Sequence, residues 1–286
     1  MRALTPSGRL PALLASLLLA VTTACARPPK APAVQPSLPP PPPDHRAQLF
    51  TADEMFRRGC YECLKDALAG YEALQADPLL GSQAHDAAIR TSLVLALREN
   101  ELGLVHGGYI EHARQLMGPP EAASPEVPGL VEMAEVIANG PTGFTRAAST
   151  DAQIAGMLTI ARSQEQWASI LRNLMPQDLT ASYIWLTLAC GPNASRLPDR
   201  DKREELLRTQ SVIPLFAFKT ATSCGLTSAS TLESMLAIEP RFGEINYYLG
   251  LLALGGQTGR PPDLDAADRW FRAAYEWRQD WPTLTL

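Results

Sequence analysis

Two cysteines near the start of the predicted folded region are spaced closely enough to react with each other. The stretch RRGCYECLKDALAGYEALQADP, residues 57–78, contains them as Cys60-x-x-Cys63. This spacing is typical of a thiol–disulfide redox couple, of half a metal site, or of a structural disulfide. A redox enzyme of the thioredoxin type also needs β-strands around the motif, and the sequence predicts none.

The sequence contains no other residue pattern that points to catalysis or to a cofactor. His106 and His112 are six residues apart, which does not place them on one face of a helix, and no H-E-x-x-H zinc motif occurs. The stretch GGQTGR, residues 255–260, lacks the form of a phosphate-binding loop, and no G-x-S-x-G motif is present. We therefore predict no catalytic residue, no metal site, no cofactor and no enzymatic activity.

The N-terminus has the features of a secretory signal. Arg2 and Arg9 form a positively charged region ahead of an apolar run, residues 10–24. The run is too short for a membrane span of about 20 residues. The run ends in VTTAC, residues 21–25, which resembles the lipobox of bacterial lipoproteins. The resemblance implies a lipoprotein signal peptide at 1–24 and a lipid on Cys25 that anchors the chain in a membrane. An ordinary cleaved signal followed by an incidental cysteine is the alternative.

The next segment predicts a spacer between this anchor and a folded domain. Residues 28–43 contain nine prolines in sixteen positions, so they favour extended polyproline II and cannot pack a core. We assign 25–47 to a disordered Pro-rich linker and 48–286 to the folded domain. By the same resemblance, Ala26 in place of an aspartate implies the outer membrane of the bacterial envelope, on its periplasmic face.

The composition fits a folded protein that does not bind nucleic acid. Hydrophobic residues make up 46% of the 286 residues, which is enough for a sizeable core. The net charge is −5, and lysines and arginines do not cluster into a face that could follow a phosphate backbone.

From residue 48 onward the hydrophobic pattern is helical almost throughout, and the predicted fold class is all-α. Thr51-x-x-Glu54 has the form of a capping box ahead of the first helix. The one strand-like run, residues 211–218, carries Pro214, which fits the first turn of a helix at least as well. Further helices are predicted near 61–76, 83–101, 109–117, 127–138, 151–162, 164–174, 178–190, 200–209, 229–238, 243–254 and 263–279.

Small and aromatic residues recur at the same spacing in two predicted helix pairs. They are Ala67, Tyr71 and Leu74 after the Gly59-x-Tyr61 turn, and Ala267, Phe271 and Ala274 near the C-terminus. This pattern resembles the tetratricopeptide repeat (TPR), in which small residues let two antiparallel helices approach and an aromatic residue fills the gap. The resemblance implies an α-solenoid of antiparallel helix pairs.

The TPR resemblance also implies a function. TPR proteins bind peptides on the concave face formed by the first helix of each pair, which makes Asn246 and Tyr247 candidates for a ligand face. The favoured interpretation is a membrane-anchored periplasmic scaffold or adaptor that binds other envelope proteins or peptides. The alternatives are a thiol–disulfide redox protein that uses Cys60 and Cys63, and a solute-binding accessory subunit of a transporter.

An oxidising compartment favours disulfides among the four cysteines other than Cys25. Cys190 and Cys224 each end a predicted helix, and such ends can lie side by side in successive pairs, so we predict a Cys190–Cys224 bond. Cys60 and Cys63 are then left together. Residues three apart within a helix have Cβ atoms about 5–6 Å apart, which is too far for a disulfide. Cys60 lies at a predicted turn, however, where closure is possible, so we predict a local bond and keep redox activity as the alternative.

Overall fold

The computed structural model describes residues 44–104, 107–118, 124–138, 167, 169–189, 213–223, 229–255 and 261–279. The chain divides into two units, Met1–Pro42 and Pro43–Leu286, and all of the described residues belong to the second. The predicted signal peptide and the predicted lipidation site Cys25 lie outside the described residues, as do Cys190 and Cys224.

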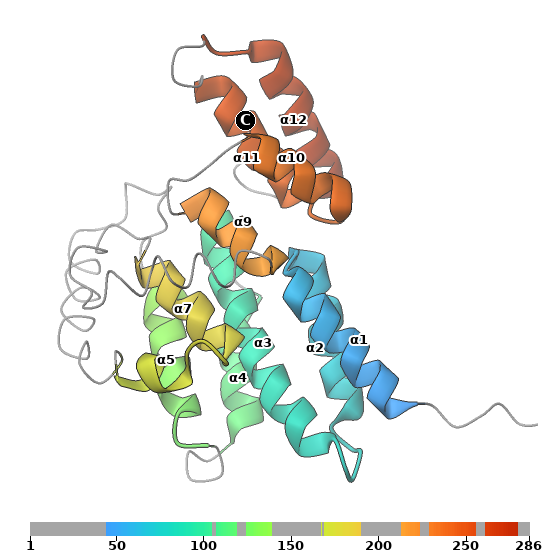
Figure 1. Ribbon diagram of the computed structural model, residues 1–286, viewed down its shortest axis with the longest axis vertical. Helices are drawn as coiled ribbons and strands as arrows, with labels where there is room; N and C mark the ends of the chain where they lie inside the picture. The colour runs from blue at the N-terminus through green and yellow to red at the C-terminus, as the bar shows by residue number, and fades with distance from the viewer. Residues whose placement is uncertain are drawn as a thin grey trace, which may run out of the picture. The chain divides into compact units, whose positions relative to one another are not determined.

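Every regular element in the described ranges is an α-helix, which confirms the all-α class for this part of the chain (Figure 1). The helices are α1 (His45–Arg58), α2 (Tyr61–Leu74), α3 (Gly81–Leu102), α4 (Tyr109–Met117), α5 (Val127–Ala138), α7 (Leu179–Ala189), α9 (Pro214–Ser223), α10 (Ala229–Ile238), α11 (Glu244–Gly255) and α12 (Leu264–Trp277). Pro214 is the first residue of α9, so the helical interpretation of the strand-like run is confirmed.

The first helix begins earlier than the sequence predicted. Asp44 caps α1, and its side chain accepts from the backbone N–H groups of Arg46 and Ala47. The predicted capping box is wrong, because Thr51 lies in the middle of α1 and its hydroxyl donates to the carbonyl of Ala47 at 2.8 Å. Asp44, upstream of the predicted cap, already accepts from the free N–H groups. Helix α1 therefore begins at His45 and includes residues 45–47, which the sequence assigned to the linker.

In the first helix pair, α1 and α2, the residues that the sequence predicted to pack the two helices are buried. Ala67, Tyr71 and Leu74 are buried on α2. Gly70, also on α2, allows a close approach to α1, since a Cβ atom built on it would lie 3.1 Å from the Cβ of Ala52. The two helices therefore pack against each other over a seam of small residues.

The last helix pair, α11 and α12, uses the same device. Ala267 and Ala274 are buried on α12, as predicted. A Cβ atom on Gly250 of α11 would lie 2.6 Å from the ring of Phe271, so the glycine leaves the space that the aromatic ring fills.

The helices at the two ends of the described chain also contact each other. Helix α9 packs against α1, α7 and α10 and so connects early and late helices (Figure 1). Arg58 at the end of α1 pairs with Glu239 after α10, across 181 residues of sequence. A stack in which each repeat touches only its neighbours would not make such contacts.

Candidate functional site

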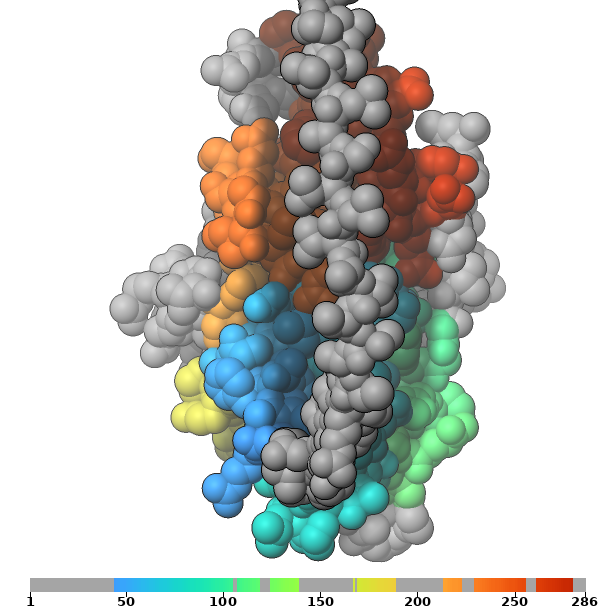
Figure 2. Space-filling view, turned by 90° about the vertical axis from the view of Figure 1, so that its right-hand side faces the viewer, coloured from blue at the N-terminus to red at the C-terminus, as the bar shows by residue number. Residues whose placement is uncertain are grey.

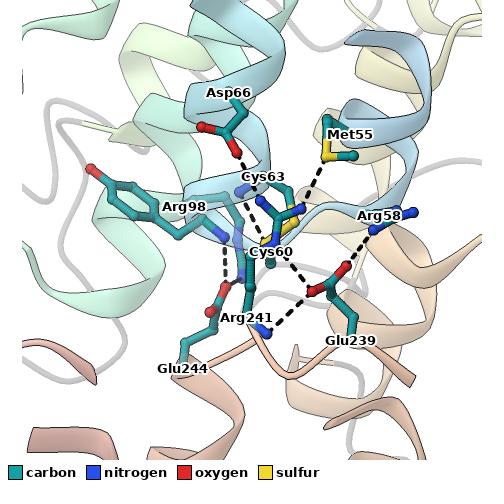
Figure 3. Close-up of a disulfide and its surroundings, with 10 residues drawn as sticks. Met55, Arg58, Cys60, Cys63, Asp66, Arg98, Glu239, Arg241 and Glu244 are labelled. Atoms are coloured by element: carbon teal, nitrogen blue, oxygen red, sulfur yellow. Dashed lines mark hydrogen bonds and ion pairs between the residues drawn. A yellow bond between two sulfur atoms is a disulfide. The ribbon is translucent and has the colours of Figure 1, made fainter. Parts of the chain in front are cut away.

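The predicted local disulfide between Cys60 and Cys63 is present in the structure (Figure 3). Cys60 is the N-cap of α2 and has an extended backbone, with φ −65° and ψ 150°. The two Cα atoms are 4.9 Å apart, and the extended backbone of Cys60 turns its side chain out of the helical direction. The Sγ atom of Cys60 also accepts a hydrogen bond from the backbone N–H of Cys63 at 2.9 Å. The turn thus makes closure possible where a continuous helix would not.

The disulfide is sealed from solvent. Both cysteines are 0% exposed and belong to an apolar cluster with Phe218, Phe242 and Ile245. Thiol–disulfide exchange requires an attacking thiolate to reach one sulfur atom. Burial therefore favours a structural role for the bond over redox turnover.

We predict that this disulfide resists chemical reduction in the folded protein. Trypsin cleaves after Arg58 and Lys65, so one peptide carries both cysteines. After mild reductant and an alkylating agent, the peptide from the folded protein should be unlabelled, and the peptide from protein unfolded in urea should carry two labels. Cys60→Ala with Cys63→Ala should lower the free energy of unfolding by roughly 2 kcal/mol in the chain-entropy model. Rapid labelling of the folded protein would instead support a redox role.

Charged side chains surround the disulfide and connect α1 and α2 to the turn between α10 and α11 (Figure 3). Glu239 accepts from Arg58 at 2.7 Å and from the Nε atom of Arg241 at 3.2 Å. Arg241 also donates to Asp66 at 2.8 Å. Burial would raise the pKa of Glu239, but its bonds to the Arg241 backbone and to both arginines outweigh that effect and lower the pKa. The group therefore stays a carboxylate that joins the early and late helices.

Beneath this layer, Arg98 of α3 and Glu244 of α11 form an ion pair. Both side chains are 0% exposed. The Nη2 atom of Arg98 donates to Glu244 at 2.6 Å, and the backbone N–H of Tyr61 donates to the same oxygen at 2.9 Å. Burial raises the pKa of Glu244, and these two donors offset the rise only in part. The Arg98 guanidinium also lies 3.9 Å from the centre of the Phe218 ring, where a cation–π contact adds to the ion pair.

A second carboxylate, Glu101, has 11% of its side chain exposed and joins α3 to α7 and α9. It accepts from the hydroxyl of Tyr183 at 2.7 Å and from Arg98 at 3.2 Å, and it pairs with the ammonium group of Lys219. Burial would raise the pKa of Glu101, but Lys219 and Arg98 lower it below its usual range. Burial also lowers the pKa of Lys219, although Glu101 opposes that shift.

These ion pairs form one buried charged network, which we define as Arg98, Glu99, Glu101, Lys219 and Glu244. Glu99 completes it by accepting from the hydroxyl of Tyr61 at 2.9 Å and from the backbone N–H of Gly107 at 2.8 Å. Each carboxylate has at least two donors, which offset part of the cost of burying its charge, although the Oε2 atom of Glu244 has no hydrogen-bond partner among the described residues. The network thus fits a structural role in holding the helices together. No sequence pattern predicted this network, although charges inside the leucine-rich run LVLALREN are the local signal of it.

The two candidates for a ligand face are buried. Asn246 and Tyr247 on α11 are each 8% exposed. The Nδ2 atom of Asn246 donates to the carbonyl of Gly243 at 3.0 Å, and the Tyr247 ring lies 5.9 Å from that of Phe271. Their role in ligand binding stays a prediction, and this packing does not favour it.

A concave surface lies elsewhere, in an open groove of about 690 Å³. Asp53 and Phe56 of α1, Tyr71 of α2, the first half of α3 and residues 173–180 line it. Helix α1, in blue, and residues 169–189, in yellow, both reach the surface on the face drawn in Figure 2. The volume lies in the range of ligand pockets, about 300–1,000 Å³. The groove is the candidate binding site of the described part of the chain.

The described residues contain neither a cluster of metal ligands nor a helix that could cross a membrane. No group of three or more histidine, cysteine or acidic side chains is placed to hold a metal ion. Within the same ranges, no helix combines the length and the apolar character that crossing a membrane requires.

Three features of the described residues bear on function: the disulfide, the buried charged network and the groove. Comparison of the chain with protein-family models, with curated proteins and with solved structures found no match.

Proposed function

We propose that the protein is a lipid-anchored adaptor of the bacterial envelope that binds other envelope proteins or peptides and is not an enzyme. The N-terminal sequence supports the anchor: an apolar signal-like run ends in VTTAC, and a segment with nine prolines in sixteen residues follows it. In this proposal Cys25 carries the lipid, the Pro-rich segment is the spacer, and the helical domain lies on the periplasmic face of the outer membrane.

The proposed binding role is supported by a contrast. The disulfide and the charged side chains of the network are buried, whereas the groove is open to solvent. The two cysteines are buried in an apolar cluster, and the side chains of the buried charged network are almost entirely shielded from solvent. The groove is open and mixes apolar walls with carboxylates and amides, as surfaces that bind peptides do.

The proposal includes a repeat architecture. We assign α1–α2 and α11–α12 as TPR-like helix pairs of an α-solenoid. The seams at Gly70 and Gly250, where helices approach closely, support this assignment. The contacts between α1 and the turn after α10 depart from a simple stack of repeats, because they join the late helices to the early ones.

The anchor and the adaptor role can be tested together. Cells that express the full chain are fed a fatty acid with a chemical handle, and the envelope is cross-linked and solubilised. We expect the wild type to carry the fatty acid and to retain a cross-linked protein partner, and the Cys25→Ser variant to lose the label and to leave the membrane fraction. An unlabelled wild type would remove the anchor from the proposal. A labelled wild type without any cross-linked partner would contradict the adaptor role.

A further inference from the structure

We propose that the groove between α1, α3 and residues 173–180 binds a lysine or arginine side chain of an extended peptide segment, with Asp53 as the residue that pairs with its charge. This inference rests on the proposed adaptor function and names the chemistry of the partner. It follows from the charge, the apolar surface and the amide groups that line the groove.

The far wall of the groove is fixed by Arg90. Its Nε atom donates to Asp86 at 2.6 Å, and its guanidinium pairs with Asp178. Asp178 also holds the start of α7, because it accepts from the backbone N–H of Ala181 at 3.0 Å. One arginine thus faces two carboxylates, which leaves this wall with an excess of one negative charge.

The near wall adds a carboxylate with no basic partner among the described residues. Asp53 accepts from the hydroxyl of Tyr71 at 2.7 Å through its Oδ1 atom. Burial and Asp53 raise the pKa of Tyr71, so the phenol keeps its proton and continues to donate. Arg57, one turn along α1, is exposed and forms no ion pair with Asp53, although its charge opposes the rise in the pKa of Tyr71. Asp53 therefore has an oxygen left for an incoming cation.

The apolar and amide groups that line the groove favour binding of a charged side chain on a peptide over binding of a free cation. Phe56 of α1 and Leu174 and Leu179 on the opposite side supply apolar surface. Lysine and arginine side chains match this combination, since an apolar stem carries the charged head. Gln83 and Gln177 line the groove and are exposed, and their amides can donate to and accept from a peptide backbone.

Fluorescence anisotropy with a labelled ten-residue peptide of alternating serine and lysine tests this inference on the full chain in detergent. We expect saturable binding that Asp53→Asn weakens about tenfold, as the loss of a charged hydrogen bond does. Asp268→Asn on α12 removes the same charge at an exposed position outside the groove. It should change the dissociation constant by less than about twofold, because exposed charges are screened by solvent and salt.

A second variant and two competitors make the test decisive. Gln177→Lys places a positive charge at an exposed groove position, so it should weaken binding without disturbing the Asp53–Tyr71 bond. A serine–norleucine peptide should not compete, and the free polyamine spermidine should compete only weakly. No binding, equal loss in Asp53→Asn and Asp268→Asn, or equal competition by spermidine would overturn the inference. If Asp53→Asn keeps the cross-linked partner in cells, the groove assignment fails while the adaptor role stands.

Discussion

Arg98→Met is expected to lower the free energy of unfolding by about 3–5 kcal/mol, because it leaves Glu244 buried without its charge partner. Methionine fills much of the same space, so the loss arises from the charge rather than from a cavity. Glu101 keeps Lys219 and Tyr183 as partners, so the damage centres on Glu244. Urea unfolding followed by circular dichroism measures the change.

An exposed pair on α12 supplies the matched control. Arg272 pairs with Asp268 at 2.7 Å, and the two side chains are 74% and 60% exposed. Arg272→Met should therefore change stability by less than about 1 kcal/mol. Adding Glu244→Gln to Arg98→Met removes the orphaned charge, keeps an acceptor for the N–H of Tyr61, and should recover at least about 1 kcal/mol. Equal effects of Arg98→Met and Arg272→Met would show that the buried pair does not hold the helices together.

Within the described residues, local sequence signals predicted the helices well, because those signals act over short distances; the helices predicted near 151–162 and 200–209 lie outside those residues. Proline at the first turn predicted α9, which begins at Pro214. The capping box at Thr51 failed because two caps competed: Asp44 lies upstream, and its carboxylate accepts from two backbone N–H groups. A pattern of residue types shows that a cap is possible and does not show which of two caps the chain uses.

Contacts between distant parts of the chain could not be predicted from such signals. Glu244 lies 146 residues from Arg98 and 183 residues from Tyr61. Helical periodicity places a residue on a face, and it carries no information about which charge on another helix will meet that face. The groove was missed for the same reason, since α1, α3 and residues 173–180 form it only after folding.

The disulfide shows where local reasoning was sufficient. The spacing of Cys60 and Cys63 excludes a bond inside a helix, and the glycine before Cys60 predicted a turn. The structure contains that turn: Gly59 ends α1 in the left-handed region with φ +70°, and Cys60 caps α2. The same glycine fixes how the turn meets α9.

Gly59→Ala is expected to lower the free energy of unfolding by about 2–5 kcal/mol. An alanine at φ +70° is strained, which costs about 1–2 kcal/mol. Its Cβ atom would also lie 2.5 Å from the Cβ of Leu215 and 2.6 Å from its Cα, so α9 would have to move. Overpacking of this kind adds about 1–3 kcal/mol. Urea unfolding monitored by tryptophan fluorescence measures the loss.

Gly108→Ala separates the two contributions, because Gly108 shares the backbone conformation of Gly59 and lacks its neighbour. Its φ is +76°, and a Cβ atom there would meet nothing within 4 Å. Gly108→Ala should therefore cost only the conformational strain, about 1–2 kcal/mol. The excess loss in Gly59→Ala then measures the contact between the α1–α2 turn and α9. If the two variants lose the same stability, that contact contributes little, and the closure of the late helices onto the early ones must depend on the buried charged network instead.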